Sequence, residues 1–271
     1  MTEKNMQTNK NKNTIIVAHR GASYAAPENT IPSFELAFKE DADFIEGDFW
    51  LTKENEIVCI HDPDTKRVTE AKIKMKVQSS TLSELKKLDV GSWKGNEFTG
   101  TTIPTLKEVL QIIPEGKGIY VEIKDDREIF AERLREILKQ FYIPNDKLRI
   151  ISFNPNTVRL AKKYLPEIKV YWLFEWYFSK KRCLKSLALR RLMQTLHTLK
   201  CDGIDLNSAP YIDEKLVKTL RDNNLDLCAY DVDKIEDAMR LINLGVDSIT
   251  TNSPLKMREE IKNNINNSEI K

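Results

Sequence analysis

The chain alternates between short apolar runs and segments in which apolar residues recur every three to four positions. The apolar runs are typical of buried strands and the recurring segments of amphipathic helices. The predicted strands lie at 14–18, 43–48, 119–123, 148–152, 168–173, 203–206, 225–230 and 246–250. The predicted helices lie at 30–41, 105–113, 127–140, 155–164, 180–199, 212–222 and 234–243. Eight strands that alternate with helices within one domain predict an α/β fold of the (β/α)₈ TIM barrel type.

One further strand-like run, at 56–60, follows the second predicted strand too closely for a helical crossover. Only residues 52–55 separate the two, so they should form an antiparallel hairpin. Residues 62–104 are turn-rich and carry one short helix, which opens at a capping box beginning with Thr81. The sequence therefore predicts a small hairpin and loop insertion after strand two. An open doubly wound sheet is the alternative, but it usually has a Gly-rich loop after its first strand, and this chain has none there.

Nothing between the predicted elements has the composition of a linker between domains. We expect one domain over 14–260, a disordered N-terminal tail over 1–13 and a frayed C-terminal tail over 261–271. The first 13 residues are polar and lack the apolar core of a signal peptide or membrane span, so we expect a cytoplasmic protein.

Charge and cysteine content narrow the choice of partners and compartment. The 43 basic and 41 acidic residues nearly cancel, and a net charge of +2 gives no electrostatic case for a nucleic-acid partner. The four cysteines lie singly, without a CxxC pair. They are therefore interpreted as buried free thiols in a reducing compartment.

The second strand carries two carboxylates on one face. Glu46 and Asp48 are two residues apart, so in an extended strand they point the same way. Burying two unpaired carboxylates side by side is costly, and a hard divalent cation such as Mg²⁺, Ca²⁺ or Mn²⁺ is the usual remedy. The alternative is an exposed edge strand with solvated acids, but Ile45, Phe49 and Leu51 are too apolar for open solvent.

Two of the three histidines lie at the ends of apolar runs. His19 follows the first strand, and the hairpin brings His61 to within about one residue of Asp48. Active sites of TIM barrels lie at the carboxyl ends of the strands, where strand three would also place Glu122 and Lys124 on one face. The predicted fold therefore collects the histidines and carboxylates at one end of the barrel.

Several motifs together resemble the glycerophosphodiester phosphodiesterase family, a group of phospholipase C-like TIM barrels. They are HRG at 19–21, PENT at 27–30, Glu-x-Asp at 46–48, HD at 61–62, TLSELKKLDVG at 81–91, IPTLKEVL at 103–110, VEIK at 121–124, ISFN at 151–154 and GVDSITTNSP at 245–254. The resemblance covers nearly everything from Ile15 to Pro254. The set is specific, whereas HRG alone would be weak.

The resemblance implies a role for each candidate residue. One divalent cation, Mg²⁺ or Ca²⁺ with Mn²⁺ as a third candidate, would bind Glu46, Asp48 and Glu122. His19 and His61 would be the general acid and base. Arg20 and Lys124 would bind the substrate phosphate, although Lys124 could equally hold Glu122 in an ion pair.

Other residues are assigned supporting roles. Glu28 and Asn29 are expected to brace the loop after His19. The third histidine, His197, lies on a helix and is interpreted as a surface or filler residue.

The walls of the substrate pocket are predicted less directly. The expected lining residues are aromatic side chains at the ends of two strands, Trp172, Phe174 and Tyr230. The segment 171–185 begins with aromatic residues and becomes basic towards its end. This segment is either a core strand followed by a solvated helix or an apolar, peripheral membrane-contacting wall for a lipid tail.

Two positions depart from the family pattern. The family usually has W-T-V-N where this chain has Tyr230-Asp231-Val232-Asp233, and often Asp where it has Asn252. We expect both changes to leave the metal and histidine residues untouched and to alter what fits around the leaving alcohol.

The resemblance implies a phosphoric diester hydrolase that converts glycerophosphodiesters to an alcohol and sn-glycerol 3-phosphate. One alternative is a lysophospholipase D-like activity on membrane lysolipids. The alternative from another class is a catalytically silent barrel that binds phosphodiesters or a partner protein.

Overall fold

The protein is described by a computed structural model that covers residues 14–175, 182–207 and 211–269. The predicted N-terminal tail over 1–13 therefore lies outside the described residues. The strands are β1 (Ile15–Ala18), β2 (Phe44–Leu51), β3 (Ile57–Cys59), β4 (Gly118–Ile123), β5 (Leu148–Ser152), β6 (Lys169–Phe174), β7 (Gly203–Asn207), β8 (Asp226–Tyr230) and β9 (Ser248–Thr251).

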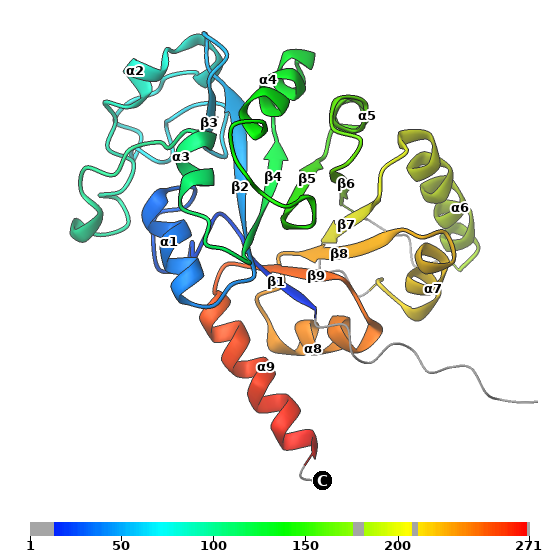
Figure 1. The fold of residues 1–271 in the computed structure, drawn as a ribbon. Coiled ribbons are helices and arrows are strands. Elements are labelled where there is room, and N and C mark those ends of the chain that lie inside the picture. The colour runs from blue at the N-terminus through cyan, green and yellow to red at the C-terminus, as the bar shows by residue number, and fades with distance from the viewer. Residues whose placement is uncertain (1–13, 176–181, 208–210, 270–271) are drawn as a thin grey trace, which may run out of the picture.

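Eight of these strands form a closed parallel barrel (Figure 1). The strand order is β1-β9-β8-β7-β6-β5-β4-β2, and pairing of β1 with β2 closes the ring. β2 is longer than β1, and its last residues pair antiparallel with β3, with Phe49 opposite Cys59. The predicted barrel and hairpin are both confirmed.

Helices cover the outside of the barrel, as Figure 1 shows for α1 and α4–α8. They are α1 (Ile31–Lys39), α2 (Leu82–Leu85), α3 (Leu106–Gln111), α4 (Glu128–Leu138), α5 (Pro155–Tyr164), α6 (Arg182–Leu199), α7 (Glu214–Asp222), α8 (Ile235–Leu244) and α9 (Pro254–Glu269). Their apolar faces and the outward residues of the strands form the main core, with Phe34, Leu134 and Leu241 fully buried. This packing fixes each strand end, and with it the loops that carry the site.

The insertion after β3 has a small core of its own. Val58 and Ile60 from the hairpin pack with Val77, Leu85 and Ile103 from the insertion. Thr81 makes the predicted capping box with Glu84 at the start of α2. The insertion is therefore a packed unit attached to the hairpin rather than a loose loop.

The C-terminal boundary differs from the expectation. A frayed tail was expected from 261, yet α9 continues to Glu269, so the expected boundary falls inside a helix. Met257 is buried and Ile261 packs against the main core. Apolar residues at this four-residue spacing anchor one face of the helix, a signal that the Asn-rich composition obscured.

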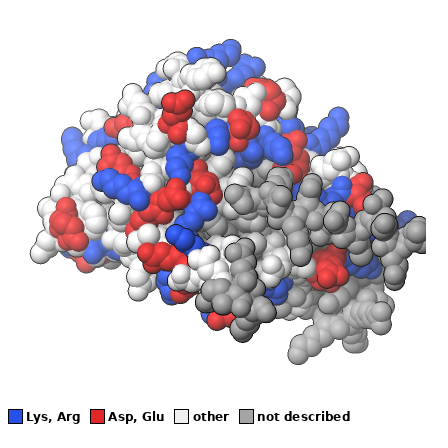
Figure 2. Space-filling view, turned by 60° about the horizontal axis from the view of Figure 1, so that its bottom comes forward, with Lys and Arg blue, Asp and Glu red and all other residues white. Residues whose placement is uncertain are grey.

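The surface agrees with the balanced charge of the sequence. On the described part of the face in Figure 2, basic and acidic side chains are intermixed. Each helix in the described part of the chain is too short or too polar to cross a membrane.

Candidate active site

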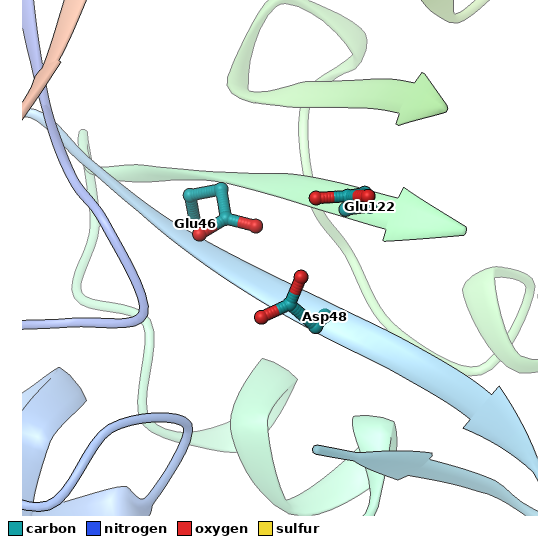
Figure 3. A group of neighbouring side chains, drawn as sticks. All are labelled: Glu46, Asp48 and Glu122. Carbon is teal, nitrogen blue, oxygen red and sulfur yellow. The ribbon is translucent and has the colours of Figure 1, made fainter. Parts of the chain in front are cut away.

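Three carboxylates meet inside the barrel at the carboxyl ends of β2 and β4. Glu46 and Asp48 come from β2 and Glu122 from β4, where Asp48 and Glu122 are partners in the strand register. One oxygen from each residue lies within 4.8 Å of the others. Figure 3 shows the three carboxyl groups converging from the two neighbouring strands. The structure therefore brings together the three residues expected to bind a metal.

Burial makes this cluster electrostatically unusual. It raises the pKa of Glu46 well above its usual range, and the charges of Asp48 and Glu122 add to the effect. Burial and the Asp48 charge likewise raise the pKa of Glu122 to about 8. For Asp48, by contrast, the charges of Lys124 and Arg20 outweigh burial and hold the pKa below its usual range. Glu46 and Glu122 therefore favour their protonated forms without a cation, because full ionisation would set three negative charges against the two positive charges of Arg20 and Lys124.

A divalent cation fits this arrangement. Oε1 of Glu46 is buried and has no hydrogen-bond partner among the described residues. All the donor atoms of the cluster are oxygens, which hard cations such as Mg²⁺ and Ca²⁺ prefer. A cation here would use the unpaired oxygen and offset the repulsion between the carboxylates.

Asn29 fixes the orientation of Asp48. Its side-chain amide donates a hydrogen bond of 2.7 Å to Oδ2 of Asp48, and its carbonyl oxygen accepts one of 3.1 Å from the Asp48 backbone N–H. Asn29 has a φ of 57°, in the left-handed region that Asn tolerates better than most residues. Asn29 also braces the loop after His19, as expected, through a backbone hydrogen bond of 3.0 Å to the Arg20 carbonyl, whereas its contact with Asp48 was not expected.

Arg20 and Lys124, the two residues expected to bind the phosphate, lie against the carboxylates. Nε of Arg20 is 3.2 Å from Asp48, and Nη1 is 3.0 Å from Glu28. Nζ of Lys124 is 3.0 Å from Asp48 and 2.6 Å from Glu122. Both cations thus hold the carboxylates while they line the same cavity.

His19 is oriented by residues from the far end of the chain. Its Nδ1 lies 2.9 Å from Oδ1 of Asn252 and 3.9 Å from Asp231. Asn252 in turn donates from Nδ2 to Asp233, which fixes its oxygen toward His19. The expectation that Asp231 and Asn252 leave the histidines untouched was wrong, because the turns after β8 and β9 meet the end of β1.

His61 is oriented from its own loop. Its Nδ1 is 2.6 Å from the adjacent Asp62, and Arg67 binds both Asp62 and Glu28. The hairpin register places His61 one residue beyond the Asp48–Ile60 backbone hydrogen bond, as the sequence predicted. Burial lowers the pKa of His61 and of His19 below the usual histidine value, so both rings are neutral at neutral pH.

These groups surround a cavity of about 210 Å³ at the mouth of the barrel. Its lining residues are His19, Arg20, Glu46, His61, Glu122, Lys124, Ile151, Phe153, Leu173, Glu175, Asp205, Tyr230, Asp231 and Thr250. Asp48 lies directly beneath, in contact with Lys124.

Of the three aromatic residues expected in the pocket, only Tyr230 lines it. Trp172 and Phe174 lie with their ring centroids 4.6 Å apart and their planes tilted by 41°, and they pack with the main core outside the barrel. Their neighbours Leu173 and Glu175 face the cavity instead. The sequence placed the aromatic side chains of β6 on the wrong face by one residue.

Several cavity residues were not expected from the sequence. Phe153 lies just after β5, two residues beyond the inward-facing Ile151, and Asp205 is the single acid of the buried strand β7. A carboxylate at a buried strand position is a signal that could have identified Asp205.

Comparison with known proteins identifies the family. The model of the glycerophosphoryl diester phosphodiesterase family matches residues 19–256. The chain is 34% identical over 251 residues to a glycerophosphodiester phosphodiesterase of Caldanaerobacter subterraneus, covering 89% of this chain and 95% of the relative. It is 29% identical to a glycerophosphodiester phosphodiesterase of Bacillus subtilis, covering 89% and 84%.

A solved structure agrees with this result. An Oleispira antarctica phosphodiesterase, in complex with the product sn-glycerol 3-phosphate, superposes with a TM-score of 0.80 at 30% identity, covering 92% of this chain and 96% of the other. The chain therefore belongs to the glycerophosphoryl diester phosphodiesterase family.

Proposed function

We propose that the protein hydrolyses glycerophosphodiesters to an alcohol and sn-glycerol 3-phosphate, with one divalent cation and with His19 and His61 as proton carriers. The observation that carries the proposal is one cavity that combines a three-carboxylate cluster, the basic side chains of Arg20 and Lys124, and two oriented histidines. The product bound by the Oleispira relative supports the same choice of product.

The basic side chains of the cavity would bind the phosphodiester. Arg20 offers a planar fork of donors, and Lys124 offers a compact charge. The cation held by Glu46, Asp48 and Glu122 would supply Lewis-acid polarisation of the phosphate. Arg20 and Lys124 would then stabilise the charge that develops on the phosphate oxygens as the bond to the leaving alcohol breaks.

The histidines would move the protons. Oδ1 of Asn252 and the Asp62 carboxylate are acceptors, so each ring carries its proton on Nδ1 and leaves Nε2 for the reaction. One ring, neutral, takes the proton from the attacking oxygen at Nε2, and the other ring, protonated on both nitrogens, gives its Nε2 proton to the leaving alcohol. The acid ring must therefore bind a proton when the ester binds, and the negative charge of the phosphate would favour that protonated form.

The test is release of sn-glycerol 3-phosphate from glycerophosphocholine by the full chain, after chelation and after adding back Mg²⁺, Ca²⁺ or Mn²⁺. We expect chelation to abolish turnover and at least one cation to restore it. Unchanged turnover in chelator would rule out the metal, and no turnover with any cation would rule out the reaction.

The alternatives are weaker on this geometry. The lysolipid alternative drew on Trp172, Trp176 and Phe178 as an apolar wall. Trp172 packs into the main core, and Trp176 and Phe178 lie outside the described residues. A silent binding barrel would not need the carboxylates and both histidines together. A reducing compartment such as the cytoplasm would suit the buried free thiols of Cys59, Cys201 and Cys228.

A further inference from the structure

The cavity has two sides of opposite character. Arg20, Lys124 and the two histidines line the side formed by β1, β2 and β4. The side formed by the ends of β6, β7 and β8 carries three acids instead, Glu175, Asp205 and Asp231. A phosphate held at the first side would leave the rest of the substrate facing acids.

Asp205 is the deepest of these acids. Its side chain is only 1% exposed and lines the cavity, and its Oδ1 has no hydrogen-bond partner among the described residues. The charged groups that act on it are Glu122 and Asp231, both acidic. A buried carboxyl group in such a place is unfavourable unless a ligand brings it a donor or a positive charge.

Two aromatic rings flank this side of the cavity. Tyr230 ends β8, and Phe153 follows β5 at the boundary with the basic side, where Nζ of Lys124 lies 5.9 Å from its ring centroid. Phe153 and Tyr230 meet edge to face, with ring centroids 6.0 Å apart. Phe153 is 43% exposed, and the buried hydroxyl of Tyr230 has no partner within the described chain. Aromatic faces beside carboxylates are the chemistry that recognises ammonium groups, through cation–π and ionic attraction.

The acid at the rim is held there by its backbone. Asp231 has a φ of 57°, a conformation that non-glycine residues adopt rarely and at some cost. This turn after β8 places the side chain in the lining of the cavity, 3.9 Å from His19.

We propose that Asp205, Asp231, Phe153 and Tyr230 form a binding site for an ammonium group on the leaving alcohol, so that the enzyme prefers cationic headgroups to neutral ones of the same shape. This inference rests on the proposed phosphodiesterase function and adds the substrate class. A site for the neutral hydroxyls of the shared glycerol half is the competing interpretation, and the test separates the two.

The first measurement compares two substrates that differ only in charge. One is glycerophosphocholine, and the other is its isostere with 3,3-dimethylbutanol, in which carbon replaces the ammonium nitrogen. We expect kcat/KM to favour the choline ester about tenfold, within the usual range for a partly desolvated cation–π and ionic contact. Equal values would overturn the inference while leaving the proposed hydrolysis intact.

Substitutions then test which residues produce the preference for the choline ester. Asp205→Asn and Asp231→Asn should each lower the choline preference to about threefold or less. Asp126→Asn is the matched control, because Asp126 is exposed and does not line the cavity, and it should keep the wild-type ratio. Equal losses on both esters in the Asp205 and Asp231 variants would overturn the inference in favour of the glycerol half.

A binding measurement is independent of turnover. Choline and 3,3-dimethylbutanol are titrated into the metal-loaded full-length protein by calorimetry. We expect choline to bind about tenfold more tightly and Asp231→Asn to remove the difference. Equal binding would overturn the inference. Selective choline binding would support it even if no ester were hydrolysed, an outcome that would refute only the proposed function.

Discussion

Each histidine of the cavity has one ring nitrogen fixed by a partner and the other available for proton transfer. Replacing His19 or His61 with Gln removes the titrating group at little cost in volume, so kcat should fall about 10²- to 10⁴-fold. His197→Gln is a matched control because the third histidine is exposed on α6. Steady-state kinetics on glycerophosphocholine would measure all three variants. Comparable losses in the His197 variant would point to misfolding rather than lost proton transfer.

Asn29 is a residue whose effect should appear in metal binding. It holds both the carboxylate and the backbone N–H of Asp48, so Asn29→Ala frees the carboxylate to rotate. Loss of such a supporting contact typically weakens metal affinity about 10- to 100-fold. Calorimetric titration of the metal-free variant with Mg²⁺ or Mn²⁺ would measure this. An unchanged affinity would show that the strand alone orients Asp48.

Between elements, Arg67 ties the insertion to the loop after β1. Its guanidinium binds Glu28, which also binds Arg20, and Asp62, which binds His61. Because the Arg67 side chain is 42% exposed, solvent screens these pairs, and Arg67→Met should cost about 1 kcal/mol of unfolding free energy at pH 7. Denaturant unfolding would measure it, with Lys72→Met, from an exposed pair in the same insertion, as the control.

The unfolding free energy lost in Arg67→Met should depend on pH. Burial alone would raise the pKa of Glu28 and of Asp62, but Arg67 and their other partners hold both below their ordinary values of 4.5 and 3.8. Carboxylates with lowered pKa contribute stability above those values and lose it as the pH falls below them. The difference between wild type and Arg67→Met should therefore be full at pH 7 and shrink below about pH 4.5. A difference that is constant down to pH 3 would contradict the ionic interpretation.

The same elements show what the sequence could predict. The two-residue period placed Glu46, Asp48 and Glu122 on inward faces correctly, because a carboxylate is informative wherever it occurs in an apolar strand. The two-residue period did not give the correct inward face for β6, because both faces of this strand are apolar. By hydrophobicity alone, either Leu173 or Trp172 could point inward. Only the register with the neighbouring strands decides which face points inward.

For the whole molecule, the barrel was predictable because its strands and helices alternate so regularly. The contacts that complete the site were not. His19 and Asn252 are 233 positions apart, and they meet only because pairing of β1 with β9 brings their ends together. The motif around Asn252 was recognised, but its contact with His19 depends on the closed ring. The sequence was therefore sufficient to predict the individual site residues, but not the contacts between them across the barrel.

The carboxylate cluster also links the site to the stability of the whole molecule. Three carboxyl groups whose oxygens lie within 4.8 Å of one another cannot all ionise without repulsion in the metal-free protein, so burying them costs stability above the pKa of a free carboxyl group. Burial and neighbouring charge raise the pKa of Glu46, so its carboxylate is the least favourable of the three. Glu46→Gln should thus raise the melting temperature of the chelator-treated protein at pH 8.

Bound metal should reverse the order of the melting temperatures of the wild type and Glu46→Gln. At a concentration of about 100 times its dissociation constant, a cation that binds only the folded state adds about 2.7 kcal/mol, which corresponds to about 5–10 °C in a chain of this size. We expect the wild type to gain this in Mg²⁺ or Ca²⁺ and Glu46→Gln to gain little, because it lacks one ligand. Differential scanning calorimetry of both proteins, with chelator and with each cation, provides the comparison. Equal gains in the two proteins would mean that Glu46 is not a ligand, and the repulsion it creates would then need another explanation.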